Sequence, residues 1–311
     1  MEQKISIIIP NYNHEPFLSN RMSSVLSQNH NFDQIFILDD ASTDSSLDLL
    51  SNYKQENVTI ICNDSNSGST FLQWQKGLSL VSTDSLVWIA ESDDFCKPDF
   101  LEEIIKPFSD PDVVLSYSRS IDVNENGEQL GLSYDHLEWC NSSFIKDGKD
   151  EIGDHLYYQC TIPNVSSVVF RRSAVDDTFF YHNFKLCGDW YFYLKILQKG
   201  KVAYNSSPLN FHRFHQRTLR NQLSNNTSIL FERLKIIKKV KKDYSIPLIM
   251  FFKSAYQQIR QYIFQRKITE IFNFKFVLLL IDILKFNPFF ILILIYTLIE
   301  RFLMRVIKFI R

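Results

Sequence analysis

The first 120 residues alternate short apolar runs with segments of helical length, and this alternation limits the folds that the chain can adopt. The runs are rich in β-branched residues and mostly uninterrupted, as in parallel strands that are buried on both faces. They predict strands at Ile5–Pro10, Gln34–Asp40, Val58–Asn63, Ser85–Ala90 and Val113–Ser118. The segments between them predict helices at Phe17–Gln28, Ser45–Tyr53, Thr70–Val81 and Phe100–Phe108. Such an alternation predicts an α/β fold with a mostly parallel sheet flanked by helices.

The alternation loosens after Ser120. Asn126-Gly127 indicates the turn of a hairpin. A further strand is expected at Ser166–Arg172, a helix at Asp189–Gly200 and a long basic helix at Asn221–Lys242. We therefore expect one α/β domain over residues 1–220, with halves at 1–120 and 121–220, and a basic, hydrophobic helical tail over residues 221–311.

Cysteine and charge usage narrow the class of protein. The five cysteines are widely spaced and form no CxxC pair, which favours reduced thiols in a cytoplasmic protein over a disulfide framework or a zinc site. The start, MEQKISIIIP, lacks the basic and long apolar regions of a signal peptide. Residues 230–311 carry 16 Lys and Arg against 5 Asp and Glu, whereas the remainder carries 18 against 30. A basic tail on an acidic body predicts contact with an anionic surface, either nucleic acid or membrane.

The tail contains two apolar runs, FKFVLLLIDILKF and PFFILILIYTLI, separated by Asn287-Pro288. Each run is shorter than the roughly 20 residues that a spanning helix needs. Four basic residues then follow on one helical face: Arg301, Arg305, Lys308 and Arg311. We expect a helical pair in the membrane interface, peripheral on the cytoplasmic face, rather than a nucleic-acid-binding segment. A core helix hairpin of a soluble protein and a re-entrant or spanning hairpin are the alternatives.

Polar motifs follow the first two predicted strands. PNYNH begins at Pro10, and Asp39-Asp40 precede Ala-Ser-Thr-Asp. The carboxyl ends of neighbouring parallel strands meet at one edge of a sheet, where ligands bind in α/β folds. Tyr12 is therefore placed to stack on a planar base while a carboxylate accepts the base N–H. Alternatively, the two motifs are only a turn and a helix entry.

The fourth strand ends in a cluster of acids within WIAESDDFCKP. Glu91 and Asp93 alternate, so their carboxylates project to the same side of an extended segment. Hard divalent cations such as Mg²⁺ or Mn²⁺ bind oxygen ligands of this kind. An N-cap for the helix after Pro98 would use only one of the three carboxylates, the third being Asp94.

Four segments, in this order, resemble the successive nucleotide-sugar-binding motifs of family 2 glycosyltransferases with the GT-A fold: ISIIIPNYNHEPFLSNRMSSVLSQ, FILDDASTDSS, NDSNSGS and WIAESDDFCKPDFLE. The resemblance covers about residues 4–220 and implies that Tyr12 and Asp40 hold the base, with Pro10 lining its pocket. Ser92-Asp93 occupies the position of the DXD element. Asp93 is then the expected metal ligand, Glu91 its flanking acid where the family usually has Asp, and Asp94 lies near the ribose or donor sugar.

The second half continues the resemblance. CGDWYFYLKIL resembles the segment that carries the catalytic base, which assigns that role to Asp189, with Gly188 where Glu is commoner. NFHRFHQRT resembles the segment where the family tends to show Tyr-Arg-x-His followed by Ser or Thr, and His215 matches that His. The resemblance implies that His215 completes the metal shell or meets the diphosphate, and that Arg213 balances the charge of the diphosphate. A helix N-terminus also stabilises the ionised form of a carboxylate such as that of Asp189.

The resemblance implies an inverting glycosyltransferase that moves a sugar from a nucleotide diphosphate sugar, a UDP-sugar, to a hydroxyl of a glycan or lipid-linked acceptor in surface polysaccharide synthesis. A divalent cation, Mn²⁺ or Mg²⁺, would stabilise the leaving diphosphate, and Asp189 would take the proton of the acceptor hydroxyl. A nucleotidyltransferase, one alternative, would be expected to carry a glycine-rich loop near the first strand, where PNYNHEPF has no glycine. A dehydrogenase is disfavoured because no GxGxxG follows any strand. A catalytically decayed carbohydrate-binding or scaffold protein on the same fold is the other alternative.

Overall fold

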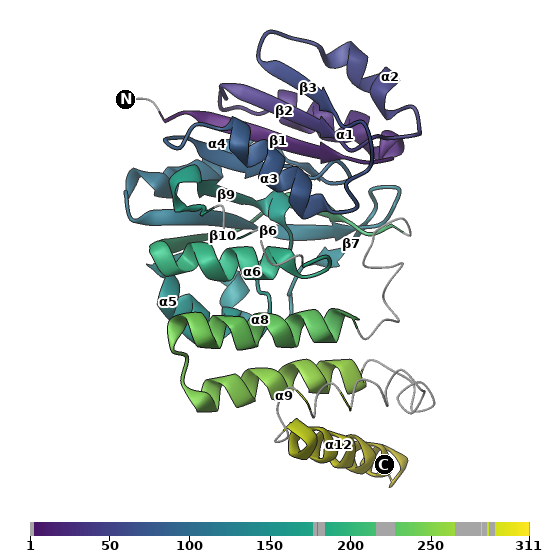
Figure 1. Cartoon of the computed structure of the whole chain (residues 1–311), viewed down its shortest axis with the longest axis vertical. Helices are drawn as coiled ribbons and strands as arrows, with labels where there is room; N and C mark the ends of the chain where they lie inside the picture. The colour runs from purple at the N-terminus through teal and green to yellow at the C-terminus, as the bar shows by residue number, and fades with distance from the viewer. Residues whose placement is uncertain are drawn as a thin grey trace. The chain divides into compact units, whose positions relative to one another are not determined.

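The computed structural model describes residues 3–176, 179, 184–215, 228–264, 281, 285 and 290–310. The chain divides into two compact units (Figure 1). The first comprises Met1–Ile152 and Thr161–Thr218, and the second comprises Gly153–Cys160 and Leu219–Arg311.

The amino-terminal part of the first unit is a parallel sheet in the strand order β3-β2-β1-β4. Its strands are β1 (Ile5–Asn11), β2 (Gln34–Asp39), β3 (Val58–Cys62) and β4 (Leu86–Ile89). The connecting helices are α1 (Glu15–Leu26), α2 (Ser46–Leu50) and α3 (Thr70–Leu80), and α4 (Phe100–Ile105) follows β4. Every residue of β1 and β4 is buried, as expected for strands covered on both faces. The strand and helix predictions for this part are confirmed, with ends that differ by a few residues.

The rest of the sheet is mixed rather than parallel. β9 (Val168–Arg171) lies antiparallel between β4 and β6 (Val113–Val123). The chain leaves β6 through a hairpin to β7 (Gln129–Leu132), with Gly127 at a φ of 85° in the turn, as Asn126-Gly127 predicted. A hairpin joins antiparallel strands, whereas parallel strands need a longer crossover connection. The strands after this hairpin accordingly form both parallel and antiparallel pairs. The expected α/β sheet is therefore present, but its second half combines parallel and antiparallel pairs.

β10 (Lys201–Arg213) returns the chain to the sheet between β6 and β5 (Phe95–Cys96). It runs parallel to β6 and antiparallel to β8 (Phe144–Asp147) and to β5. The pairs Asn210↔Cys96 and Phe211↔Phe95 place the end of β10 beside the acidic segment that follows β4. The two rings of the second pair stack with centroids 4.3 Å apart.

Helix α6 (Gly188–Ile196) corresponds to the helix predicted at Asp189–Gly200, whose last turn is a 3₁₀ helix at Leu197–Lys199. Six of its nine residues are buried. Phe192 packs edge-to-face on Phe170 of β9, with ring centroids 5.2 Å apart. This packing fixes α6 against the sheet and so fixes the position of its first turn.

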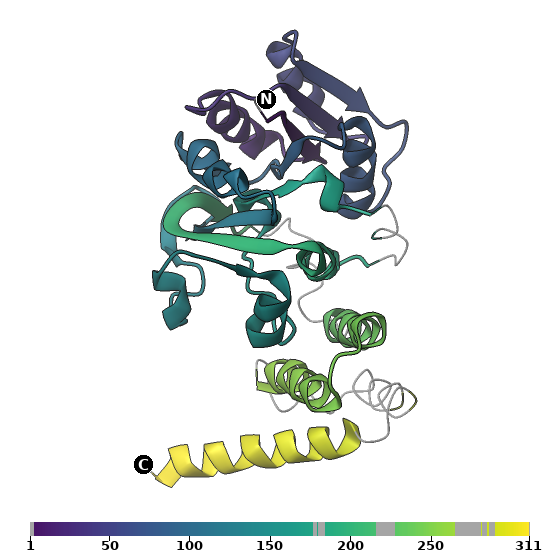
Figure 2. The same cartoon turned by 90° about the vertical axis from the view of Figure 1, so that its left-hand side faces the viewer.

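The second unit contains α8 (Ser228–Tyr244), α9 (Leu248–Phe264) and α12 (Phe290–Ile310). Figures 1 and 2 show α8 and α9 running side by side and α12 crossing α9. The short segment Gly153–Cys160 joins this unit: the Tyr157 hydroxyl donates to the Ile237 carbonyl at 2.8 Å, and Ser254 Oγ donates to the Tyr157 carbonyl at 2.7 Å. The basic helix predicted at Asn221–Lys242 corresponds to α8, and its first seven residues lie outside the described residues.

The first apolar run of the tail, at residues 274–286, lies outside the described residues except for Ile281 and Lys285. None of the helices that the structure describes has both the length and the apolar character that a bilayer crossing requires.

The prediction of a basic face on the last helix is wrong at Arg301. Arg301 is buried, and its Nη1 donates to the Ile263 carbonyl at the end of α9. The preceding residue forms an ion pair, since Glu300 Oε1 lies 3.0 Å from Arg260 Nε of α9. α12 uses these polar side chains to pack on α9, and the face that it leaves exposed is apolar. The side chains of the other three predicted basic residues lie outside the described part of the chain.

Candidate active site

The carboxyl ends of β1, β2 and β4 meet at one edge of the sheet, as predicted. Asn11 pairs with Asp39, and Ile8 pairs with Ile89. The acidic segment then turns, with Asp94 N donating to the Glu91 carbonyl at 3.3 Å. Ser166 Oγ, in the 3₁₀ turn Val165–Ser167 just before β9, accepts from Glu91 N at 3.1 Å. The four residues from Glu91 to Asp94 are therefore held by two neighbouring strands.

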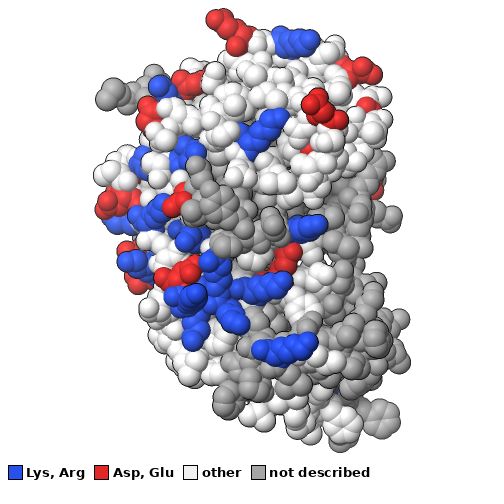
Figure 3. Space-filling model, viewed as in Figure 1, with Lys and Arg blue, Asp and Glu red and all other residues white. Residues whose placement is uncertain are grey.

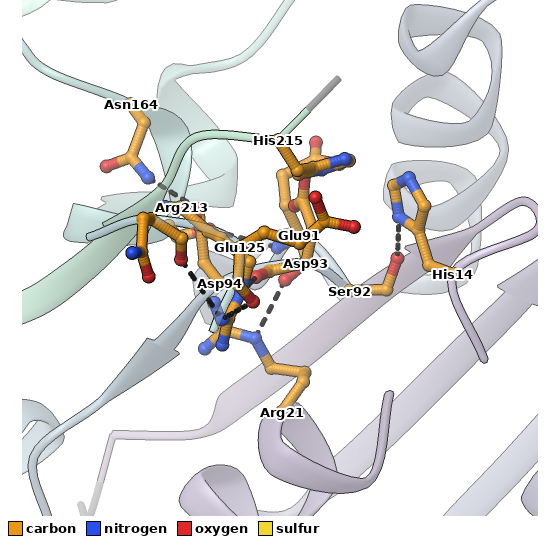
Figure 4. Close-up of polar contacts among 12 residues, drawn as sticks. His14, Arg21, Glu91, Ser92, Asp93, Asp94, Glu125, Asn164, Arg213 and His215 are labelled. Atoms are coloured by element: carbon orange, nitrogen blue, oxygen red, sulfur yellow. Dashed lines mark hydrogen bonds and ion pairs between the residues drawn. The ribbon is translucent and has the colours of Figure 1, made fainter. Parts of the chain in front are cut away.

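Three side chains from distant parts of the sequence converge at this edge. His14 follows β1, Asp93 follows β4 and His215 follows β10, and one potential ligand atom of each lies within 4.8 Å of the other two. His215 Nε2 lies 3.0 Å from Asp93 Oδ2, and His14 Nδ1 lies 2.8 Å from Ser92 Oγ (Figure 4). Imidazole and carboxylate ligands together suit first-row divalent ions such as Mn²⁺. The donor set therefore fits a divalent cation.

Two pKa shifts favour ligand-competent forms of these groups. Burial would raise the pKa of the Asp93 carboxyl, but its hydrogen bond with His215 and the nearby charge of His14 hold that pKa below its usual range. Burial lowers the pKa of His14. A metal ligand must be a carboxylate or a neutral imidazole, so both shifts act in the direction that metal binding requires.

His14 was not among the predicted site residues, although it is the last residue of the PNYNH motif. Its ring lies 5.5 Å from that of His215 and nearly perpendicular to it, at 86°. Phe17, one turn into α1, packs on the same His215 ring at 4.6 Å. A histidine directly after a strand whose end was already predicted to bind ligand was the signal that could have identified it.

Glu91 lies outside this cluster. Its Oε1 accepts from Trp74 Nε1 of α3 at 2.7 Å. Burial, together with the charge of Asp93, raises the pKa of Glu91 to about 8. The structure thus places Glu91 against an indole donor, and its predicted part as a flanking metal ligand stays a prediction.

Asp94 and Arg213 connect the acidic turn to β10. Asp94 Oδ1 accepts from Arg213 N at 2.8 Å, and its Oδ2 accepts from Asn164 Nδ2 at 2.5 Å. The Arg213 guanidinium donates to the main-chain carbonyls of Asp93 and Glu125, both at 2.7 Å. Both side chains are almost fully buried, at 3% and 4% exposure. These contacts support the turn itself, and the predicted contacts of both residues with the donor stay predictions.

The predicted base-binding residues lie at the same edge. Pro10 is buried within β1, whereas Tyr12 is 43% exposed just beyond it. Asp40 is buried and accepts four hydrogen bonds, from Asn63 Nδ2 at 2.6 Å, Gln73 Nε2 at 2.8 Å, and Ser67 N and Oγ at 2.9 and 2.8 Å. Asp40 thereby ties the loop before α3 to the end of β2.

Asp189, the predicted catalytic base, is the second residue of α6. It is not part of the cluster of His14, Asp93 and His215. Its Oδ1 accepts from the Trp190 main-chain N–H at 2.8 Å, an interaction at the helix N-terminus that stabilises a carboxylate. A side chain at the preceding Gly188 would begin 2.8 Å from ring atoms of Phe71. A larger residue before Asp189 would therefore require the Phe71 ring to move.

Comparisons with known proteins agree with this architecture. The sequence is 34% identical over 116 residues to an uncharacterized glycosyltransferase of Nostoc sp., covering 36% of this chain and 34% of that protein. It is 24% identical over 207 residues to the O-antigen chain rhamnosyltransferase RfbN of Salmonella typhimurium, covering 65% of this chain and 63% of that protein. Among solved structures, residues 1–349 of TarS from S. aureus in complex with UDP-GlcNAc match with a TM-score of 0.66 and 17% identity, covering 87% of this chain and 75% of the other.

The chain thus spans about a third of the first of these relatives and somewhat under two thirds of the second. At 17% identity the likeness to TarS shows the fold, which is of the GT-A-like kind that the sequence predicted. A sequence profile described as glycosyl transferase family 2 matches residues 6–179, more than half of the chain and all four strand-end motifs. With the parallel strand ends, the acidic turn and this match in agreement, the chain belongs to glycosyl transferase family 2.

Proposed function

We propose that the protein transfers a sugar from a UDP-sugar to a hydroxyl of a glycan or lipid-linked acceptor, with inversion at the anomeric carbon. The cluster of His14, Asp93 and His215 carries this proposal, because it gathers metal ligands at the sheet edge where α/β folds bind substrates. The UDP-GlcNAc complex of TarS, a protein of the same fold, supports a UDP-sugar as donor.

The three clustered side chains would hold Mn²⁺ or Mg²⁺, which would supply the positive charge that stabilises a leaving diphosphate. Tyr12, exposed at the end of β1, would stack on the base, and the Asp40 loop would form the side of that pocket. Asp189, which accepts from the Trp190 main-chain N–H at the start of α6, would accept the proton from the attacking hydroxyl. One base and direct displacement give inversion.

The proposed acceptor class rests on the relatives and on the second unit. RfbN acts on the O-antigen chain, which supports a surface polysaccharide as the product. α12 exposes large apolar side chains, among them Leu292 (61% exposed), Ile299 (53%) and Phe302 (65%). α8 carries six Lys and Arg against two acidic residues, and Figure 3 shows basic side chains gathered over this helix. An apolar helix face with a basic helix in the same unit suits the interface of an anionic membrane, and we place the protein peripherally on the cytoplasmic face.

The test of the proposed function measures metal binding, donor binding and the role of the catalytic base separately. Purified protein is screened with a panel of nucleotide sugars for stabilisation against heat with Mn²⁺ and with EDTA, because a bound donor raises stability by mass action. We expect Asp93→Asn to lose the metal-dependent stabilisation, and Asp189→Asn to keep it but lose turnover. Asp84→Asn is the matched control, since Asp84 has a 64% exposed side chain paired with Lys4 and should behave as wild type. Full turnover in Asp189→Asn would show that another group is the base.

The membrane proposal has its own test. The double variant Ile299→Glu and Phe302→Glu should stay in solution when wild-type protein floats with vesicles that contain phosphatidylglycerol. Leu130→Glu is the control, because Leu130 is 62% exposed on β7 and belongs to the other unit. Flotation of the double variant at the wild-type level would contradict the assignment of this helix face.

A further inference from the structure

The residue between Tyr12 and His14 has an uncommon backbone conformation. Asn13 follows the end of β1 with a φ of 54°, which lies in the left-handed region. Most residues are disfavoured in this region, whereas asparagine adopts it more readily because its short side chain can hydrogen-bond locally. Asn13 therefore sets the directions in which the proposed base platform, Tyr12, and the proposed metal ligand, His14, leave the sheet.

Asn13 is joined to the loop between β2 and α2, residues 40–45, which we call the β2 loop. Its side-chain Oδ1 accepts from Thr43 N at 2.7 Å and from Asp44 N at 3.3 Å. Its main-chain N–H donates to Ser42 Oγ at 3.0 Å. The side chain and the backbone of this one asparagine thus both bind the β2 loop.

The β2 loop also holds the residue after His14. Glu15 N donates to Asp44 Oδ2 at 3.1 Å, and Asp44 Oδ1 accepts from Ser46 N at 3.0 Å. The residues on both sides of His14 therefore donate main-chain N–H groups to this loop. The His14 ring itself lies 2.8 Å from Ser92 Oγ of the acidic turn (Figure 4). A displacement of the β2 loop would consequently move His14 relative to the acidic turn.

The other end of the β2 loop lies at the proposed base-binding edge. Asp40 begins the loop, and its main-chain N–H donates to the Asn11 carbonyl at 2.9 Å. Ala41 follows with a φ of 60°, a strained conformation for alanine that persists only where the surrounding structure holds it. Ser42 N supplies part of this support by donating to Asp39 Oδ1 at 2.8 Å. A ligand that contacts the loop at either end would add to the support.

We propose that Asn13 is a positioning residue that couples base binding to metal binding through the β2 loop. A base between Tyr12 and Asp40 would order one end of the loop, and a metal ion on His14 would order the other end. Because the second ligand would then meet a loop that is already ordered, each ligand should raise the affinity for the other by the same factor. The proposal rests on the proposed function for the identity of the base, whereas the link between His14 and the loop is independent of it.

The experiment uses uridine and Mn²⁺ as separate probes of the full chain. Uridine carries the base but no phosphate that could bridge to the metal ion, so a direct diphosphate–metal contact cannot produce the coupling. Calorimetric titration gives the uridine affinity without Mn²⁺ and with saturating Mn²⁺. Hydrogen–deuterium exchange of residues 41–45, measured with and without Mn²⁺ and in the absence of nucleoside, reports the order of the β2 loop.

Three variants identify the contribution of the Asn13 side chain. Asn13→Gly keeps the left-handed conformation and removes the acceptor oxygen. Asn13→Asp keeps both the acceptor oxygen and access to that conformation, so it is the conservative rescue. Asn52→Gly is the control, because Asn52 is an exposed asparagine in the 3₁₀ turn Ser51–Tyr53.

In wild type we expect Mn²⁺ to slow exchange at residues 41–45 and to tighten uridine binding at least about fivefold. Asn13→Asp and Asn52→Gly should keep both effects. In Asn13→Gly, Mn²⁺ should leave the exchange unchanged and alter the uridine affinity by less than about twofold. Saturating Mn²⁺ ensures that a weaker metal affinity alone cannot reduce this factor.

Unchanged exchange at residues 41–45 on addition of Mn²⁺ to wild type would overturn the proposal, as would the absence of Mn²⁺ binding. Coupling that survives in Asn13→Gly, or that is lost in Asn13→Asp or Asn52→Gly, would overturn it as well. Failure of the proposed function is a separate result. Wild-type protein whose β2 loop is protected by Mn²⁺ but which binds no uridine would support the link from His14 to the loop and would contradict a UDP-sugar as donor.

Discussion

Replacing Arg213 by Met should destabilise the first unit rather than remove a donor contact. The guanidinium is 4% exposed, and its Nε and Nη1 donate to the main-chain carbonyls of Asp93 and Glu125. It also lies 5.0 Å from the ring centroid of Phe17 and 5.1 Å from that of Phe95. The side chain therefore joins the acidic turn, α1 and the β6–β7 hairpin through four contacts.

The expected size of the effect follows from these contacts. A hydrogen bond from a charged donor contributes about 1.5–3 kcal/mol, and each cation–π contact contributes about 0.5–2 kcal/mol. Removing the buried cation also removes its desolvation cost, and Met recovers part of the packing between the two rings. We therefore expect a net loss of about 3 kcal/mol, which lowers the melting temperature by about 6–12 °C for a unit of this size.

The assay is urea unfolding followed by circular dichroism in EDTA, with Arg213→Lys as the matched variant. Lys keeps the charge but reaches fewer of the carbonyls, so it should lose about half as much stability. In parallel, the affinity of the folded protein for UDP is measured with saturating Mn²⁺. A lost phosphate contact worth about 1.4 kcal/mol would weaken this affinity tenfold, and we expect a smaller change. An Arg213→Met protein with wild-type stability and no UDP binding would refute this reasoning and restore Arg213 to the donor site.

Three further outcomes are expected. His14→Gln should weaken Mn²⁺ binding at least tenfold by isothermal titration while melting within a few degrees of wild type, and unchanged Mn²⁺ affinity would exclude His14 as a ligand. Gly77→Ala should cost about 1–3 kcal/mol in urea unfolding, because the new Cβ would lie 2.6 Å from Ile8 Cγ2 of β1; wild-type stability would contradict this packing. Burial raises the pKa of Cys96 to about 11, so at pH 8 a thiol reagent should label exposed Cys62 and leave Cys96 unmodified until unfolding, as peptide mapping can verify.

The sequence predicted the parallel half of the fold well, because each strand there is a short apolar run that ends in polar residues. β1, β2 and β3 end within a residue of the predicted boundary. It did not predict that β9 would enter the sheet antiparallel between β4 and β6. Strand direction depends on how the chain returns after the β6–β7 hairpin, and hydrophobic periodicity carries no information on that path.

The candidate site was predicted where one segment alone supplies the chemistry. Asp93 lies in an acidic turn that is visible in the sequence, and its partner His215 lies beside it as expected. His14 follows a predicted strand end, which was a local signal, but its approach to His215 depends on the return of β10 to the same edge. Arg213 was predicted to balance the diphosphate charge, and Arg301 was predicted to lie on a basic helix face, but both donate to main-chain carbonyls. Whether an arginine faces solvent or backbone is decided by packing, which its own neighbours in sequence do not reveal.

The return of β10 has a consequence for how such proteins are recognised. The family profile ends at residue 179, whereas Asp189 and His215 lie beyond that point. Family membership is therefore assigned from one segment of the chain, whereas part of the proposed catalytic site lies in another segment. A relative that kept residues 6–179 intact but lost the end of β10 would still be counted in the family after its chemistry had gone. Surveys of this family for active members should accordingly ask for the histidine that closes the site as well as for the acidic turn.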